Sequence, residues 1–271
     1  MNKLLKIFNQ KVLNSDVSFI NKKYKNLRYS ASFKVTGNVE DDKGLTIRRS
    51  VLFTGRQLIR ASSNLSQGKL LYKLAAFTSN DIGSKINIIE FGTCVGISGM
   101  YLLAGMNKET GGKLTTFEGI SELAEISKNN FDEFLQNKKL FKSKYDIKLG
   151  RFKDTVVDHI TNLNEPIHLA FVDGDHSEKT TLKLHNLLKK GLHSDGIIVH
   201  DDISDSEEMA RAWEKIKMEE GANKIAVLKL GGIPSRGIVF MSGHGQKEVQ
   251  TYDLDNFFER ILRRLFRKFK I

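Results

Sequence analysis

Four aspartates in two short clusters carry the strongest chemical signal in the sequence. Asp173 and Asp175 follow one apolar run, and Asp201 and Asp202 follow the next. Each run has the length and composition of a buried strand, so both clusters are expected at the carboxyl edge of neighbouring parallel strands, where open α/β sheets bind ligands. Four carboxylates held close together repel one another unless they are protonated or a cation neutralises them. Oxygen donors of this kind predict a site for Mg²⁺ or a similar hard divalent cation.

A glycine-containing turn lies earlier in the chain, in the segment EFGTCVGIS at residues 90–98. Gly92 and Gly96 at the end of a predicted strand let the backbone turn sharply and approach a ligand, and the helix that follows offers free N–H groups. The spacing matches neither the G-x-G-x-x-G dinucleotide fingerprint nor a Walker loop. Glu118 ends the next predicted strand, where a carboxylate can accept hydrogen bonds from ribose hydroxyls. Together these residues predict a nucleotide-like ligand.

From Lys85 onward, short apolar runs alternate with segments of helical periodicity, which predicts parallel βαβ units. The predicted strands are Ile86–Phe91, Lys113–Glu118, Tyr145–Leu149, Ile167–Val172, Gly196–His200, Lys224–Leu230 and Gly237–Met241. The predicted helices are Leu65–Phe77, Ser98–Leu103, Ser121–Leu135, Thr155–Leu163, Glu178–Leu188 and Ser204–Met218. Only a short glycine- and proline-containing turn separates the last two strands, so these should pair antiparallel. The expected fold is α/β: a Rossmann-like, seven-stranded, mostly parallel sheet with an antiparallel last strand and helices on both faces.

Several residues near these motifs have structural roles as alternatives. Ser204 and Glu207 form a capping-box pattern, so Asp202 or Ser204 is expected to cap the helix that follows. His200 alternates away from the Asp201 side chain and is expected to be packed or solvated. Trp213 occupies a helical core position.

The glycine turn, the acid that ends the second strand and the antiparallel final pair resemble the class I S-adenosylmethionine-dependent methyltransferases. This resemblance covers residues 65–242. In that family the turn holds the methionine part of the cofactor and the strand-two acid holds its ribose. The resemblance implies S-adenosyl-L-methionine as the cofactor, with eight residues near it: Glu90, Gly92, Thr93, Gly96, Ser98, Glu118, Gly119 and Asp173.

The two aspartate clusters resemble the sugar O-methyltransferases of macrolide and aminocoumarin biosynthesis, in which Asp-x-Asp follows strand four and Asp-Asp follows strand five. This resemblance implies three metal ligands: Asp173, Asp201 and Asp202. It also implies Asp175 as the base that removes the acceptor's proton. The chain departs from that family after each motif, with His176 where an aromatic residue is usual and Ile203 where tyrosine is usual. His176 is therefore an alternative base, because the unperturbed histidine pKa of about 6.5 suits proton transfer at neutral pH.

The composition is that of a protein with a real core: 271 residues, 40% of them hydrophobic, with one cysteine and two prolines. Disorder, a collagen repeat and a disulfide scaffold are excluded. The single cysteine, Cys94, favours a reducing compartment, and the first 16 residues do not form a secretory signal. The formal net charge of +11 divides unevenly, with +9 in residues 1–60, −1 in residues 61–246 and +3 in residues 247–271.

The basic ends suggest how the chain is organised. Residues 1–64 read as a basic extension, polar and weakly periodic over residues 14–60, that could contact the substrate or cover the site. Residues 65–246 read as the methyltransferase domain, and residues 247–271 as a basic amphipathic C-terminal helix. The segment FFERILRRLFRKFKI, at residues 257–271, places apolar residues at helical spacing with arginines on the other side. This pattern predicts a helix that packs on the core, lies on an anionic membrane surface or contacts nucleic acid.

The sequence therefore predicts an S-adenosylmethionine-dependent O-methyltransferase that acts on a hydroxyl of a small molecule or sugar, such as a lipid-linked glycan. Its expected location is the cytoplasm, at the inner face of the membrane, and a homo-oligomer is compatible with the sequence. One alternative is an RNA methyltransferase that uses the basic ends, although the Asn/Asp-Pro-Pro-aromatic motif of many N-methylating enzymes is missing after strand four. The other is a non-catalytic binding module that retains the fold.

Overall fold

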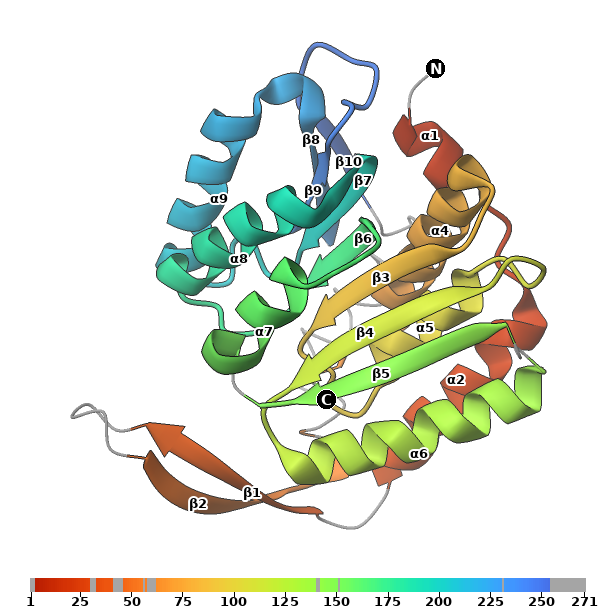
Figure 1. The fold of residues 1–271 in the computed structure, drawn as a ribbon, viewed down its shortest axis with the longest axis vertical. Helices are drawn as coiled ribbons and strands as arrows, with labels where there is room; N and C mark the ends of the chain where they lie inside the picture. Colours follow the sequence, from red (N-terminus) through yellow and green to blue (C-terminus); the bar gives the residue numbers. More distant parts are fainter. Residues whose placement is uncertain are drawn as a thin grey trace. The chain divides into compact units, whose positions relative to one another are not determined.

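The computed structural model describes residues 3–29, 33–40, 46–55, 57, 62–139, 142–150, 152–230 and 232–253. The chain divides into two compact units, and each is described by itself (Figure 1). One unit comprises residues 6–169, and the other comprises residues 170–271 with residues 1–5. The predicted amphipathic segment at residues 257–271 lies outside the described residues.

The main sheet has the predicted α/β character. Among the described residues its strands are β3 (Ile86–Phe91), β4 (Gly112–Glu118), β5 (Ser143–Leu149), β6 (Ile167–Val172), β7 (Leu192–His200), β8 (Ile225–Leu230), β9 (Ile233–Phe240) and β10 (Gln250–Asp253). Their hydrogen-bonding order is β10-β8-β9-β7-β6-β3-β4-β5. β9 runs antiparallel to both β7 and β8, whereas β3, β4 and β5 pair in parallel and β10 pairs in parallel with β8. β10 is an eighth strand, which the sequence did not predict. Its four residues are too few and too polar to give a strand pattern.

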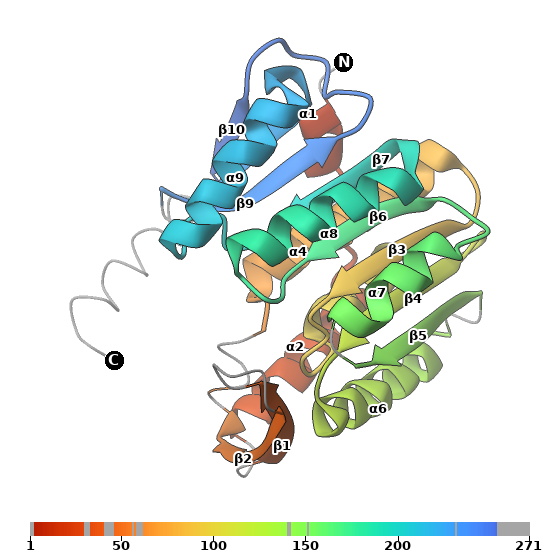
Figure 2. The same cartoon turned by 60° about the vertical axis from the view of Figure 1, so that its left-hand side comes forward.

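In the unit of residues 6–169, helices lie on both faces of β3, β4 and β5 (Figures 1 and 2). α7 (Phe152–Thr161) covers one face, where the ring of Phe152 contacts Phe91 at a centroid distance of 5.6 Å. α4 (Leu65–Ile82) and α5 (Ile97–Gly105) lie on the other face, and α6 (Ser121–Lys138) lies beside β5. α4 begins at a capping box between Asn64 and Gln67 and ends at Gly83, whose φ is 70°.

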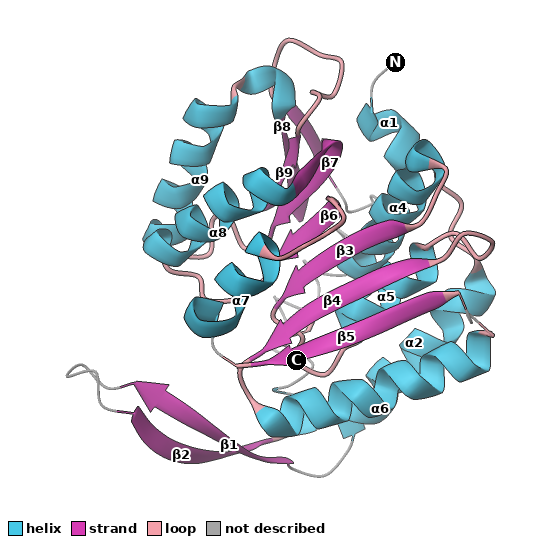
Figure 3. Ribbon diagram, viewed as in Figure 1, coloured by secondary structure: helices cyan, strands magenta, loops and turns pink. Residues whose placement is uncertain are grey.

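The basic extension contains regular structure that its polar sequence did not reveal. A hydrogen bond links α2 (Asn14–Tyr29) to α5: the Tyr101 hydroxyl of α5 donates to Asn21 Oδ1 of α2 at 3.0 Å. β1 (Phe33–Glu40) and β2 (Thr46–Phe53) form an antiparallel pair (Figure 3). Residues 14–60 are polar and weakly periodic, so the sequence does not predict this pair.

In the other unit, α8 (Glu178–Gly191) and α9 (Glu207–Glu220) pack against each other, and the short helix η1 (Ala222–Lys224) leads into β8. The predicted capping box at Ser204 is wrong. α9 begins at Ser206, whose hydroxyl accepts a hydrogen bond from Met209 N at 3.2 Å, while the Ser204 hydroxyl donates to the Pro234 carbonyl. The chain turns once more between residues 203 and 205 before the helix starts, so the cap moves by two residues.

The start of α1 (Lys3–Phe8) is tied to this unit, because the Lys3 ammonium donates to Asp195 Oδ1 at 3.2 Å and to Ser242 Oγ at 2.6 Å. None of the helices that the structure describes combines the length and the apolar composition needed to cross a bilayer.

Candidate active site

The glycine turn between β3 and α5 has the strained backbone that glycine permits. Gly92 and Gly96 have φ values of 94° and 81°. The amides of Gly92 and Thr93 both donate to the Phe117 carbonyl, at 3.1 and 3.2 Å, which ties the turn to the end of β4. A Cβ at Gly96 would lie 3.0 Å from the Phe131 ring, so a larger residue there must push that ring away. The turn is therefore shaped by backbone bonds and close packing together.

Glu118, the predicted ribose-binding acid, is held in place by backbone amides. Its Oε2 accepts from Cys94 N at 2.8 Å and its Oε1 accepts from Ile120 N at 3.0 Å. The side chain is buried, and burial raises its pKa while the amide hydrogen bonds oppose that rise. Each carboxylate oxygen has a second lone pair, so Glu118 can still accept hydrogen bonds from a ligand. A Cβ at the neighbouring Gly119 would meet nothing within 4 Å, so the turn that follows Glu118 has open space at this position.

Three other predicted cofactor residues form a buried hydrogen-bonded chain beneath the turn. Thr116 Oγ1 donates to Glu90 Oε2 at 2.7 Å and lies 2.5 Å from Thr93 Oγ1, so Thr93 must be the donor in that pair. Ser98 is also hydrogen-bonded to Glu90. Glu90 is fully buried, its Oε1 has no partner among the described residues, and burial raises its pKa to about 7. The side chains of Glu90, Thr93 and Ser98 thus support the turn from inside the protein.

In the other unit, the structure brings together two of the predicted metal ligands and the alternative base. Ligand atoms of Asp173, His176 and Asp202 all lie within 4.8 Å of one another. His176 Nε2 is 3.8 Å from Asp173 Oδ1. Burial and the neighbouring Asp201 charge raise the pKa of Asp202 to about 6. This group, Asp173–His176–Asp202, has the mixed carboxylate and imidazole donors of a candidate metal site.

Asp201 does not join that group, because its carboxylate is engaged elsewhere. Arg236 Nε donates to Asp201 Oδ1 at 2.7 Å and Nη2 donates to Oδ2 at 3.0 Å. The Arg236 side chain is fully buried, and its guanidinium lies over the Phe171 ring, 5.0 Å from the centroid. The Asp201 amide donates to the Val172 carbonyl at 2.9 Å, which fixes the backbone where the aspartates emerge. Sequence reasoning missed Arg236, although an arginine within an apolar strand was a visible signal.

Asp175, the base implied by the resemblance, lies at the start of α8. Its Oδ2 accepts from the Thr180 hydroxyl at 2.9 Å and its Oδ1 accepts from Ser177 N at 3.4 Å. The residue is exposed and has a φ of 49°. The structure thus groups His176, and not Asp175, with Asp173 and Asp202.

Of the residues given structural roles, His200 and Trp213 are packed in the interior. His200 is fully buried, and its ring centroid is 6.1 Å from that of Trp213, which is also buried. Cys94 has a φ of 49° within the glycine turn and contributes its amide to Glu118.

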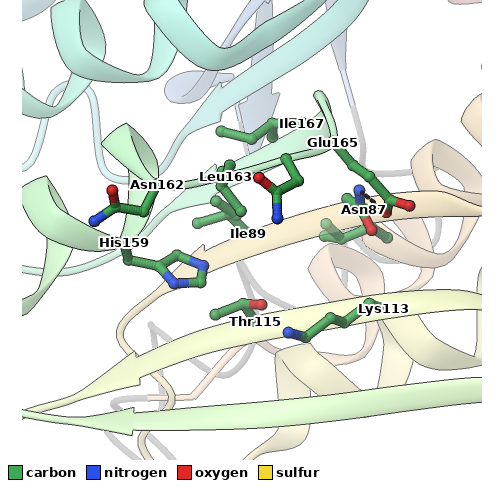
Figure 4. Close-up of a pocket in the computed structure, with 11 residues that line it drawn as sticks. Asn87, Ile89, Lys113, Thr115, His159, Asn162, Leu163, Glu165 and Ile167 are labelled. Atoms are coloured by element: carbon green, nitrogen blue, oxygen red, sulfur yellow. Dashed lines mark hydrogen bonds between the residues drawn. The ribbon is translucent and has the colours of Figure 1, made fainter.

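A pocket of about 360 Å³ is lined by none of these residues (Figure 4). It is lined from the amino-terminal halves of β3 and β4, the end of α7 and the start of β6, and Asn87 donates to Glu165 Oε2 across one side at 3.0 Å. The predicted cofactor and metal residues instead lie at or just after the carboxyl ends of their strands. Open α/β sheets bind their ligands at those ends, so this pocket is not where such a ligand is expected.

Part of the chain matches a known domain family. Residues 89–203 match the family model of a methyltransferase domain, a range that contains all the predicted site residues. No curated protein sequence matches the chain.

Solved structures share the fold at low sequence identity. An O-methyltransferase from Bacillus cereus in complex with S-adenosylhomocysteine is 20% identical, with a TM-score of 0.51 over 68% of this chain and 83% of that one. The O-methyltransferase TomG from Streptomyces achromogenes, in complex with S-adenosylmethionine, is 18% identical, with a TM-score of 0.53 over 68% and 82%. The Podospora anserina methyltransferase PaMTH1, bound to S-adenosylhomocysteine, is 16% identical, with a TM-score of 0.51 over 86% and 90%. Residues 89–203 thus match a methyltransferase domain, and the fold is shared with structures of S-adenosylmethionine-dependent methyltransferases.

Proposed function

We propose that the protein transfers a methyl group from S-adenosylmethionine to a hydroxyl of a small molecule or sugar. The observation that carries this proposal is Glu118, a buried carboxylate oriented by two backbone amides beside the glycine turn and followed by Gly119, where there is open space. Two proteins of the same fold are described as O-methyltransferases, which favours oxygen as the methylated atom.

In this proposal the cofactor supplies a methyl group that is already activated by its sulfonium. The chain must bind the cofactor, place the acceptor oxygen in line and remove the acceptor's proton. In this proposal, Glu118 accepts hydrogen bonds from the ribose hydroxyls of the cofactor, and the turn between Gly92 and Gly96 lets the backbone approach the methionine part of the cofactor. Glu90, Thr93 and Ser98 hold that turn from beneath through their buried hydrogen bonds.

The Asp173–His176–Asp202 group binds and activates the acceptor hydroxyl in this proposal. Two half-buried carboxylates with nearby donor atoms suit a divalent cation, which would supply positive charge that favours ionisation of an acceptor hydroxyl. The carboxylate oxygens of Asp173 and Asp202 would hold the cation, and oxygen donors of this kind suit Mg²⁺ or a similar hard cation, which leaves the His176 imidazole to act as a base. Asp201 orients the segment through Arg236 and does not serve as a ligand.

His176 is the side chain that we assign to proton removal, ahead of Asp175. Its ring lies beside Asp173, whereas both oxygens of Asp175 already accept hydrogen bonds at the start of α8. His176→Asn is therefore expected to lower kcat more than Asp175→Asn at neutral pH, and equal losses would contradict the assignment.

Calorimetry with S-adenosylmethionine tests the first layer of the proposal, since absence of binding at millimolar cofactor would remove it. Mass spectrometry of a reaction with cell extract then identifies the acceptor by the mass of one added methylene. A product in the glycan or small-molecule fraction supports the proposal, whereas a product in the RNA fraction or in none contradicts it. For the metal, activity that survives both excess chelator and Asp202→Ala would show that no cation is needed.

We also propose, from sequence alone, that residues 257–271 dock the enzyme on an anionic membrane surface. The Phe and Leu residues of FFERILRRLFRKFKI would insert, and each basic residue near the surface adds about 1 kcal/mol. Flotation with anionic liposomes, with and without residues 257–271, tests this, and equal recovery of the two chains would contradict it.

A further inference from the structure

A buried hydrogen-bonded chain of three titratable residues lies beside the end of β7 and is not used by the proposed chemistry. His200 Nε2 is 3.1 Å from His185 Nδ1, and His185 Nε2 is 3.2 Å from Glu220 Oε1. Both histidines are fully buried, and Glu220 is 2% exposed at its side chain. The three residues come from β7, α8 and α9, so the hydrogen bonds join both helices to the strand.

The protons in this chain have one allowed order. Burial raises the pKa of Glu220, but hydrogen bonds from Lys189 and His185 outweigh that effect and hold the carboxyl ionised. A carboxylate only accepts, so His185 Nε2 must carry the proton that it donates. Burial lowers the pKa of His185, so its ring is neutral and Nδ1 is a bare acceptor. His200 must then donate from Nε2, because the 3.1 Å hydrogen bond between His200 Nε2 and His185 Nδ1 needs a proton and His185 Nδ1 has none.

The opposite order is disfavoured by the far side of the His200 ring. His200 Nδ1 is buried and has no hydrogen-bond partner among the described residues. If His200 accepted at Nε2, its proton would sit on Nδ1 as a buried donor without an acceptor, which carries the full cost of desolvation. The chain is therefore directional, from His200 to His185 to Glu220.

The end of β7 is also confined by packing. His200 pairs with Gly237 of β9, and a Cβ at Gly237 would lie 2.3 Å from the Trp213 ring. Trp213 thus fills the space above this strand pair, beside the His200 ring. Asp201 and Asp202 are the next residues of the chain, and the Asp201 amide is bonded to the Val172 carbonyl. A shift of the His200 backbone therefore changes the positions of Asp201 and Asp202, which follow it directly in the chain.

We propose that His185 is a positioning residue, which holds the ring of His200 by accepting its Nε2 proton and thereby fixes Asp201 and Asp202. The effect on catalysis rests on the proposed function, whereas the hydrogen-bonded chain and its effect on the backbone do not. Glu220 orients His185 from the outer end, where Lys189 and Lys224 neutralise the carboxylate.

Two substitutions of His185 each keep one of its two hydrogen bonds. In His185→Asn the amide oxygen can accept from His200 in place of Nδ1, while the hydrogen bond to Glu220 is lost. In His185→Gln the longer side chain can donate to Glu220, while the acceptor for His200 is lost. Asn186→Gln, at an exposed position of the same helix, is the matched control.

The first measurement is nitrogen NMR of the full chain labelled in histidine. Both His185 and His200 are expected as the tautomer protonated at Nε2, and an Nδ1-protonated form of either would overturn the proposal. Amide hydrogen exchange then reads the backbone without any activity. The Asp201 amide is expected to exchange about tenfold faster in His185→Gln, the factor that corresponds to one lost buried hydrogen bond, and within about threefold of the unsubstituted protein in His185→Asn and Asn186→Gln.

Activity completes the test. In His185→Gln kcat is expected to fall about tenfold with an unchanged KM for S-adenosylmethionine, and His185→Asn should recover most of it. Equal exchange of the Asp201 amide in both His185 variants would overturn the positioning role. If the unsubstituted protein shows no methyl transfer, the proposed function fails, and the tautomers and amide exchange still decide this inference. If His185→Gln does not fold, the tautomers of the unsubstituted protein and the exchange in His185→Asn decide it.

Discussion

The end of β4 and the end of β7 each carry a buried acid, and they hold it by different means. Glu118 is oriented by the amides of Cys94 and Ile120, which belong to the turns beside it. Asp201 is oriented by the guanidinium of Arg236, which is 35 residues away on another strand. An acid held by amides keeps its negative charge available to a ligand, whereas an acid paired with a buried arginine is neutralised and becomes part of the framework.

The largest expected effect follows from breaking the ion pair. Arg236→Met should leave the Asp201 charge buried without a partner and lower the free energy of unfolding by about 3–5 kcal/mol. Urea unfolding at neutral pH measures this. Arg211→Met is the control, because Arg211 forms its ion pairs with Glu178 and Glu207 at the surface. A loss no greater than that of the control would show that Asp201 is not held as described.

The acid beneath the glycine turn gives the next effect, which depends on pH. Burial raises the pKa of Glu90 from 4.5 to about 7, so the folded protein retains this proton over a range in which the unfolded chain loses it. Stability from this group is complete below pH 4.5 and is lost as the pH rises through 7. Over this window the loss amounts to about 3 kcal/mol.

Glu90→Gln mimics the protonated acid and removes that dependence. The free energy of unfolding of the variant, relative to the unsubstituted protein, should therefore increase steadily from pH 4.5 to 7 when urea unfolding is repeated along the series. Glu109→Gln, at a side chain that is 90% exposed, serves as the control. A difference that stays flat with pH would mean that Glu90 is ionised in the folded protein.

The amide-held acid should matter for binding. Glu118→Gln keeps the shape of the side chain and removes its charge, so calorimetry should show S-adenosylmethionine binding about 10–100-fold more weakly, the range for hydrogen bonds to a charged group. Thermal unfolding of the same variant checks that the turn survives. Unchanged affinity would remove Glu118 from the cofactor site.

The smallest effects concern the helix starts in the two units. The side chain of Asn64 accepts from Ser66 N and Gln67 N at the start of α4, whereas Ser177 accepts only from Thr180 N at the start of α8, at 3.3 Å. Asn64→Ala should cost about 1–2 kcal/mol and Ser177→Ala about 0.5–1 kcal/mol. Thermal unfolding ranks them, and a larger loss at Ser177 would contradict the ranking.

The comparison of the two acids also explains what could be predicted from the sequence. Features set by neighbouring residues were recognised: β3 and β6 have the predicted bounds, and Gly92 and Gly96 have the positive φ that the turn requires. The antiparallel pairing of β8 and β9 followed from the short turn between them, and structure confirms it.

Features set by distant partners were not recognised. The sequence shows Asp201 and Arg236 separately, and only the pairing of β7 with β9 brings them together. The same holds for His185, His200 and Glu220, whose hydrogen bonds connect three elements. Because the four aspartates of the two clusters looked alike in the sequence, their division into a framework acid, a helix-start acid and a candidate metal pair required the structure.

The place of β9 between β7 and β8 has a consequence for synthesis of the chain. β7 leaves the ribosome well before β9, so its free edge at residues 197–200 has no partner until residues 237–240 emerge. Arg236 arrives on the same late strand, 35 residues after Asp201, a delay of about 2–7 s at about 5–20 residues per second. Until then the nascent chain holds an open strand edge beside an aspartate that cannot be buried. Residues 233–240 cover the free edge of β7 and place Arg236 beside Asp201 in the same step. A chain released before residue 233 is therefore expected to bind chaperones through its open strand edge and to lack activity.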